Sequence, residues 1–161
     1  MTDFFIADLH FGSPDQSYAK SRGFTSSEAM QEMIASGWQA RVTDRDTVWV
    51  LGNVGDYEPL RDLPGAKRLI FGDQDDREAA FESGVFITRA PSHMLHTEQG
   101  SILLIHDPLA SRFKDVRVLY GGTGPDEPDD RSMSVSVDEI GWAPVSLPEV
   151  LERFAARAAN S

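Results

Sequence analysis

Short apolar runs that end in glycine or in polar residues recur along most of the chain. They lie within residues 3–8, 46–53, 66–73, 100–108 and 115–122. Runs of this length and composition are typical of strands that are buried on both faces. The pattern therefore predicts five buried strands, and Pro108 and the paired glycines at 121 and 122 mark the ends of the last two.

Two other segments carry apolar residues at helical spacing. In residues 25–42 the spaced positions are Met30, Met33, Ile34, Gly37 and Trp38. Thr25, followed three residues later by Glu28, resembles a capping box and predicts the start of this helix. The second segment is the C-terminal one, where Pro148 suits a first helical turn. Its apolar stripe comprises Leu147, Val150, Leu151, Phe154, Ala155 and Ala158.

The remaining segments predict a half-exposed strand and a loop. Residues 132–139 alternate apolar and polar side chains, as such a strand does. Residues 124–131 are acidic and interrupted by proline, which is typical of a loop. Strands that alternate with helices predict a layered α/β fold, and the length suits one domain over residues 1–161.

The composition narrows the classes of function. The 161 residues include 15 Lys and Arg against 26 Asp and Glu, which gives a formal net charge of −11. This charge disfavours non-specific binding to nucleic acid or to an anionic membrane, and it suits a basic protein partner on the acidic surface. The chain has no cysteine, no apolar run of the ~20 residues that span a bilayer, and no signal-like start. We therefore expect a soluble, cytoplasmic protein; the sequence does not indicate its oligomeric state.

Polar residues that can bind metals follow four of the predicted strands. They are Asp8 and His10, Asn53, Asp73 and Gln74, and His106. Ligands of α/β sheets bind beyond the carboxyl ends of strands, and Asp with His suits zinc, manganese or iron. Taken singly, His106 fits a core histidine and "GDQDD" fits a solvated turn. Only the order and spacing of the whole series favour a metal site.

The series "ADLHFG", "DTVWVLGN", "LIFGDQDD", "LLIHDPL" and "LYGGTG" resembles a small calcineurin-like metallophosphoesterase of the compact bacterial and phage type. The closing "VDEIGWAPVSLPEV" resembles the C-terminal strand and helix of those proteins, so the resemblance spans nearly the whole chain. It implies an α/β fold in four layers, a two-sheet β-sandwich flanked by helices. It also implies a pair of metals bound by the motifs D-x-H, G-D, G-N-H-[DE], a lone H and G-H-x-H.

The chain keeps some motif positions and changes others. Asp8 and His10 match D-x-H, and His106 matches the lone histidine. Asn53 stands where the resemblance implies the carboxylate that bridges the metals. The other changes are Asp73 for the metal-binding asparagine, Gln74 for the histidine that acts as general acid, and Gly122 and Gly124 for two histidine ligands.

These changes predict a degenerate active site. A neutral amide bridges two cations poorly, so we do not expect an intact dinuclear site. Gln74 has no proton to transfer at neutral pH, and we expect no intact catalytic residue. Asp8, His10, Asp73 and His106, with Asn53 at the bridging position, form a residual ligand set for no metal or for one Mn or Zn ion.

Three functions are compatible with this sequence. The first is a pseudoenzyme, inactive or very weak, that serves as a binding or regulatory module. The second is a phosphoesterase with residual or altered activity that uses a single metal. The third is a nucleotide or phosphate sensor, which the clustered carboxylates at Asp8, Asp73, Asp75 and Asp76 disfavour because they repel phosphate.

Overall fold

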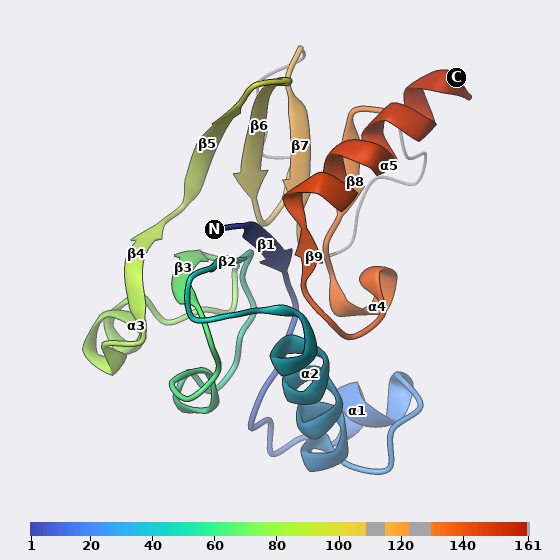
Figure 1. Cartoon of the computed structure of the whole chain (residues 1–161). Coiled ribbons are helices and arrows are strands. Elements are labelled where there is room, and N and C mark those ends of the chain that lie inside the picture. Colours follow the sequence, from blue (N-terminus) through green and yellow to red (C-terminus); the bar gives the residue numbers. More distant parts are fainter. Residues whose placement is uncertain (109–114, 123–129, 161) are drawn as a thin grey trace.

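The structure is a computed structural model that describes residues 1–108, 115–122 and 130–160, and it contains two β-sheets flanked by helices (Figure 1). The larger sheet has the order β4–β3–β2–β1–β9, in which only β9 is antiparallel to its neighbour. Its strands are β1 (Asp3–Ile6), β2 (Thr47–Val50), β3 (Ala66–Ile70), β4 (Phe86–Ala90) and β9 (Val145–Ser146).

The smaller sheet has the order β5–β6–β7–β8. The β5–β6 pair is antiparallel, and the other two pairs are parallel. Its strands are β5 (Ser92–Thr97), β6 (Gly100–Ile105), β7 (Arg117–Tyr120) and β8 (Ser132–Ser134). The chain passes from one sheet to the other directly between β4 and β5, so these two edge strands follow one another along one side of the molecule (Figure 1).

The helices of the described residues lie outside the two sheets. The α1 and α2 helices stand together on one side of the larger sheet, and α5 runs beside β8 and β9 (Figure 1). The helices are α1 (Ser17–Ser21), α2 (Ser27–Arg41), α3 (Arg77–Ser83), α4 (Val137–Ile140) and α5 (Leu147–Ala159), with a 3₁₀ turn at Glu58–Leu60.

Alternate side chains of β1 belong to two different cores. Phe4 and Ile6 pack in the core that contains the buried face of α2, whereas Phe5 packs in the core that contains side chains of both sheets and of α5. A strand that is buried on both faces must carry apolar side chains at every position. This requirement explains why the strand runs in the sequence are nearly continuous in apolar residues.

The predicted strand at 132–139 is wrong in its second half. Pairing with β7 ends at Ser134, and Val137–Ile140 form the one-turn helix α4. Val135 and Val137 are both buried, which explains the alternating pattern without a strand at residue 137. Gly141, at φ 87°, ends the helical turn in a left-handed conformation that glycine adopts without steric cost.

The two long predicted helices are present, with corrections at their ends. The N-cap of α2 is Ser26, whose side chain accepts a hydrogen bond from the Ala29 N–H, so the capping box at Thr25 is wrong. Met33 is 50% exposed and faces away from the core. In α5 Pro148 lies in the first turn, as predicted. The α5 stripe is shorter than predicted, because Ala155 and Ala158 are exposed.

The structure also contains elements that the pattern did not predict, namely α1, α3, β4 and β5. The predicted loop at 124–131 lies outside the described residues except for its last two positions. Within the described parts of the chain, no helix combines the length and the apolar character needed to cross a membrane.

Candidate functional site

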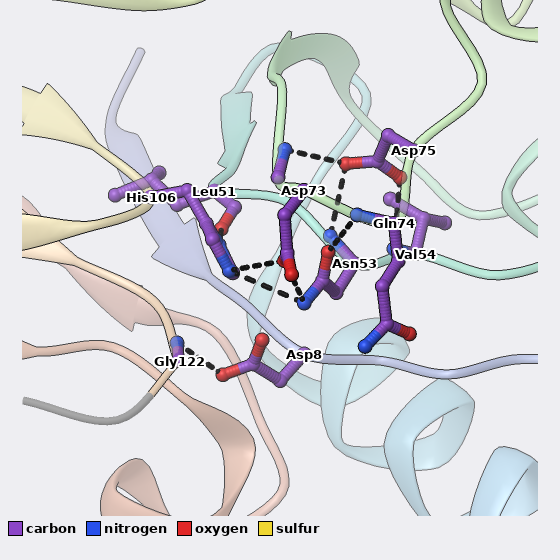
Figure 2. Close-up of polar contacts among 10 residues, drawn as sticks. Asp8, Leu51, Asn53, Val54, Asp73, Gln74, Asp75, His106 and Gly122 are labelled. Atoms are coloured by element: carbon purple, nitrogen blue, oxygen red, sulfur yellow. Dashed lines mark hydrogen bonds and ion pairs between the residues drawn. The ribbon is translucent and has the colours of Figure 1, made fainter.

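The polar residues that follow β1, β2, β3 and β6 converge at one edge of the two sheets (Figure 2). Because β1, β2 and β3 are parallel, their carboxyl ends lie side by side. The loops that leave them bring Asp8, Asn53 and Asp73 together, and β6 delivers His106 from the smaller sheet. The structure thus brings together residues from the four loops that the sequence analysis singled out.

The loops at this edge are held in conformations that are uncommon for residues with side chains. Asp8, His10 and Asn53 have φ angles of 61°, 49° and 51°. Hydrogen bonds between the two loops fix these conformations, since the Asp8 N–H donates to the Gly52 carbonyl over 3.0 Å and the His10 N–H to the Asn53 carbonyl over 3.1 Å. Such left-handed residues persist where the surroundings overdetermine them, and they are concentrated at functional sites.

The Asn53 side chain lies at the centre of the polar contacts. Its Nδ2 donates to Asp73 Oδ1 over 3.1 Å and lies 3.2 Å from His106 Nε2. Its Oδ1 accepts the backbone N–H of Gln74 over 3.1 Å. A backbone N–H only donates, so this contact fixes which end of the amide is oxygen. The amide NH₂ group therefore faces Asp73 and His106.

The neutral ring of His106 fits this arrangement in one tautomer. Its Nδ1 lies 2.7 Å from the carbonyl oxygen of Leu51, which only accepts hydrogen bonds, so Nδ1 carries the proton. Nε2 is then an acceptor for the Asn53 amide. The ring is buried, with a side chain 10% exposed, whereas the Asp73 side chain, 3.6 Å from Nε2, is 76% exposed.

Asp75 is a residue whose role the sequence analysis missed. Its carboxylate accepts hydrogen bonds from the backbone N–H groups of Gly72, Asn53 and Val54, at 2.8, 2.9 and 3.2 Å. It also accepts the Tyr57 hydroxyl at 3.2 Å, and burial, with the nearby Asp75 charge, raises the pKa of Tyr57. Asp75 thus joins the loop after β3 to the loop after β2. The resemblance placed it at the last position of the G-N-H-[DE] motif and did not indicate this anchoring role.

Two glycines let these loops approach one another. A Cβ added to Gly72 would lie 2.3 Å from Asn53 Oδ1, and one added to Gly52, at φ 86°, would lie 2.6 Å from His106 Nδ1. Both distances are far shorter than a normal van der Waals contact, so the Asn53–His106 arrangement requires glycine at these positions.

Asp8 approaches the loop after β7 from the opposite side. Its Oδ2 accepts the Gly122 N–H over 2.6 Å, a contact that needs no side chain at position 122. Its Oδ1 is buried and has no hydrogen-bond partner among the described residues, and Asp8 as a whole is only 4% exposed. An unpaired buried carboxylate oxygen is costly, and such atoms are uncommon in folded proteins.

An open cleft of about 390 Å³ lies beside these residues. Asp8, His10, Asn53, Gln74 and Gly122 contribute to its wall, and the sequence analysis missed its other lining residues. These are Tyr18, Ser21, Arg22, Ser136 and Asp138.

The cleft is formed in part by an aromatic pair and an ion pair. The His10 ring stacks on Tyr18 with centroids 4.0 Å apart, and burial, with the nearby Arg22 guanidinium, lowers the pKa of His10. Arg22 pairs with Asp138 over 3.0 Å at both Nε and Nη2, while its Nη1 contacts Met30 Sδ at 3.4 Å. No local sequence signal connects Arg22 with Asp138, because 116 residues separate them.

The predicted ligand set is only partly assembled. Asp73 and His106 lie 3.6 Å apart, and the Asn53 NH₂ group contacts both of them, at 3.1 and 3.2 Å. Among the described residues, no group of three or more His, Cys, Asp or Glu side chains has the geometry to hold a metal ion. Gly122 contributes its backbone N–H, and Gly124 lies outside the described residues.

No family model matches the chain, and no curated protein matches it in sequence. A solved structure with a similar fold is the protein of unknown function AQ665 from Aquifex aeolicus, with a TM-score of 0.72, 18% identity, and 94% of this chain and 98% of that chain covered. The phosphoesterase Yfce from E. coli is a more distant neighbour, with a TM-score of 0.44, 16% identity, and 84% of this chain and 78% of that chain covered.

Proposed function

We propose that this chain is a degenerate calcineurin-like metallophosphoesterase with that family's four-layer fold, which binds a ligand or partner without hydrolysing phosphate esters. The motif order supports the relationship. So does the convergence of Asp8, Asn53, Asp73 and His106 at one edge of the sheets, since these residues come from the four loops that the resemblance implies. The acidic surface, with a net charge of −11, suits a basic protein partner.

The observation that carries the proposal is the orientation of the Asn53 amide. Its NH₂ group faces Asp73 Oδ1 and His106 Nε2, which are the atoms a metal would need. A cation between them would meet N–H dipoles that point their positive ends toward it. Turning the amide over would place its NH₂ group against the Gln74 N–H and lose that hydrogen bond.

The donor set does not fit a dinuclear metal site. Two cations at short distance need a bridging carboxylate, and position 53 offers a neutral amide. Gln74 also has no proton to give to a leaving alkoxide, and the loss of a general acid typically costs about 10²–10⁴ in rate. The missing bridging carboxylate and the missing general acid follow from the residue types at positions 53 and 74, and neither depends on how these side chains are packed.

The test compares the wild type with the variant Asn53→Asp/Asp73→Asn/Gln74→His, which restores the residues that the resemblance implies at three of the five changed positions. Turnover of bis(p-nitrophenyl) phosphate with added Mn²⁺ is measured for both proteins, and bound metal is measured by elemental analysis. We expect no metal-dependent turnover by the wild type. Wild-type turnover that chelation abolishes and Asp8→Ala removes would contradict the proposal.

A second candidate function is a hydrolase that uses one Mn or Zn ion. The approach of Asp73 to within 3.6 Å of His106, together with the unpaired Oδ1 of Asp8, favours it. This candidate requires the Asn53 amide NH₂ group to give up its contacts with Asp73 and His106. It predicts turnover only of esters with good leaving groups, and it fails if Asp8→Ala leaves any observed turnover unchanged.

A further inference from the structure

The unpaired oxygen of Asp8 identifies the chemistry that the cleft accepts. Asp8 is only 4% exposed, yet its Oδ1 has no hydrogen-bond partner within the described residues. A buried carboxylate normally has a counter-ion, a full set of donors, or both. The Asp8 carboxylate accepts one hydrogen bond, from the Gly122 N–H. Because Asp8 lines the cleft, a ligand there can supply the missing counter-ion and a further hydrogen-bond donor.

The described residues around the cleft provide no free cation for Asp8. Arg22 is the cationic side chain in the cleft wall, and its guanidinium already pairs with Asp138 through two nitrogens. His10 also lies in the wall, but its ring stacks on Tyr18 and makes no hydrogen bond to Asp8 among the described residues. The Asp8 charge is therefore uncompensated, and the exposed carboxylate of Asp73 adds to the negative potential nearby.

The geometry of Asp8 distinguishes between kinds of cation. A guanidinium pairs best with both oxygens of a carboxylate, and Oδ2 already accepts the Gly122 N–H. A divalent metal needs several ligands, and the described residues hold no group of three suitable side chains. An ammonium group needs only separate acceptors at hydrogen-bonding distance, and the wall offers the carboxylate of Asp8 and the hydroxyl oxygens of Ser21 and Ser136.

We propose that the cleft binds the primary ammonium group of a small organic amine, with Asp8 as its counter-ion. This proposal deepens the non-catalytic binding function proposed above and rests on it. The volume of about 390 Å³ is within the range of small-molecule sites. Tyr18, stacked on His10, provides an aromatic wall for the carbon chain of the amine. Because Oδ1 itself is buried, a rotation of the Asp8 carboxylate about its soft terminal torsion brings an oxygen to the ligand.

The test is an NMR titration of the whole chain with n-butylammonium. The backbone N–H of Gly122 is the reporter, because it donates to Asp8 directly. Two control compounds separate the contributions of the carbon chain, the charge and the N–H donors to binding. n-Butanol has the carbon chain without the charge, and tetramethylammonium has the charge without an N–H donor. We expect a saturable shift of the Gly122 signal with n-butylammonium and none with either control.

Matched variants complete the experiment. Asp8→Asn keeps an acceptor for the Gly122 N–H and loses the charge, and we expect it to weaken n-butylammonium binding by about tenfold or more. Asp115→Asn removes one charge from an exposed position and should leave binding unchanged. Thermal melting and the dispersion of the NMR spectrum verify that each variant is folded.

The outcomes separate the two proposals. No saturable shift with n-butylammonium, an equal shift with tetramethylammonium, or full binding by Asp8→Asn would each overturn the ammonium site. Any of these results in a protein without phosphodiesterase turnover would leave the proposed non-catalytic function standing. Metal-dependent turnover that needs Asp8 would instead overturn the proposed function itself.

Discussion

The side-chain amide nitrogen of Asn53 lies 3.2 Å from Nε2 of His106. The same amide nitrogen donates to Asp73 Oδ1 over 3.1 Å. Three polar residues from three loops thus satisfy one another directly. Their hydrogen bonds need no cation, so substitutions of Asn53 test how the site responds when these bonds are removed.

Asn53→Asp should destabilise the protein when no metal is present. The new carboxylate would face Asp73 Oδ1 and an acceptor nitrogen of His106, and both hydrogen bonds of the amide NH₂ group would be lost. We expect a loss of about 1–3 kcal/mol in the free energy of unfolding, measured by urea denaturation.

The same variant should respond to Mn²⁺ where the wild type does not. The carboxylate introduced at position 53 would supply the charged ligand that the set lacks, and binding to the folded state raises the melting temperature. Asn160→Asp, at the C-cap of α5, is a control that adds the same charge far from the site. An equal Mn²⁺ response in wild type and Asn53→Asp would show that Asn53 does not hinder metal binding.

Asp75→Ala should be among the more damaging substitutions at this edge. It would leave the N–H groups of Gly72, Asn53 and Val54 without their acceptor. Bonds to a charged acceptor are stronger than neutral ones, so we expect a loss of about 3 kcal/mol in the free energy of unfolding. Asp62→Ala, at an exposed position, is the matched control, and an equal effect of the two substitutions would refute the anchoring role of Asp75.

Asp8→Asn should stabilise the protein. The substitution removes a buried charge with an unpaired oxygen, and the new amide can still accept the Gly122 N–H. Functional sites often retain groups that cost stability. We therefore expect Asp8→Asn to raise the free energy of unfolding by about 1 kcal/mol, measured by urea denaturation. A marked loss of stability would indicate that Oδ1 has a partner in solution.

His93 should titrate below its ordinary range. Partial desolvation of its ring, with the charge of Arg68 nearby, lowers its pKa below 6.5, and the ring stacks on Trp49 with centroids 4.6 Å apart. The folded state binds the proton less readily than the unfolded state, so the contribution of His93 to stability is present above pH 6.5 and is lost as the pH falls below it.

NMR of the imidazole nitrogens measures this titration directly. Arg68→Gln removes a positive charge near the ring and should raise the pKa of His93 toward 6.5. A His93 pKa at or above 6.5 in the wild type would contradict the prediction.

The buried strands could be predicted from the sequence, because they depend on local composition. Apolar runs such as residues 3–8 and 46–53 favour burial on both faces. That their polar ends meet depends on the parallel pairing of β1, β2 and β3, which only the structure shows. The pattern failed at 132–139, where Val135 and Val137 are buried in two different cores and Val137 begins the helix α4. It also missed β4 and β5, whose side chains are largely exposed and lack a continuous apolar run.

The sequence by itself determined which chemical groups are available: an amide at position 53, a carboxylate at 73, an amide at 74 and a histidine at 106. Only the tertiary structure decided how they are used. The Gln74 N–H orients the Asn53 amide, the Leu51 carbonyl fixes the proton on His106, and neither contact has a sequence signature. The unpaired oxygen of Asp8 is likewise a property of the packed site, because hydrogen-bond satisfaction depends on the directions of groups that lie far apart in the chain.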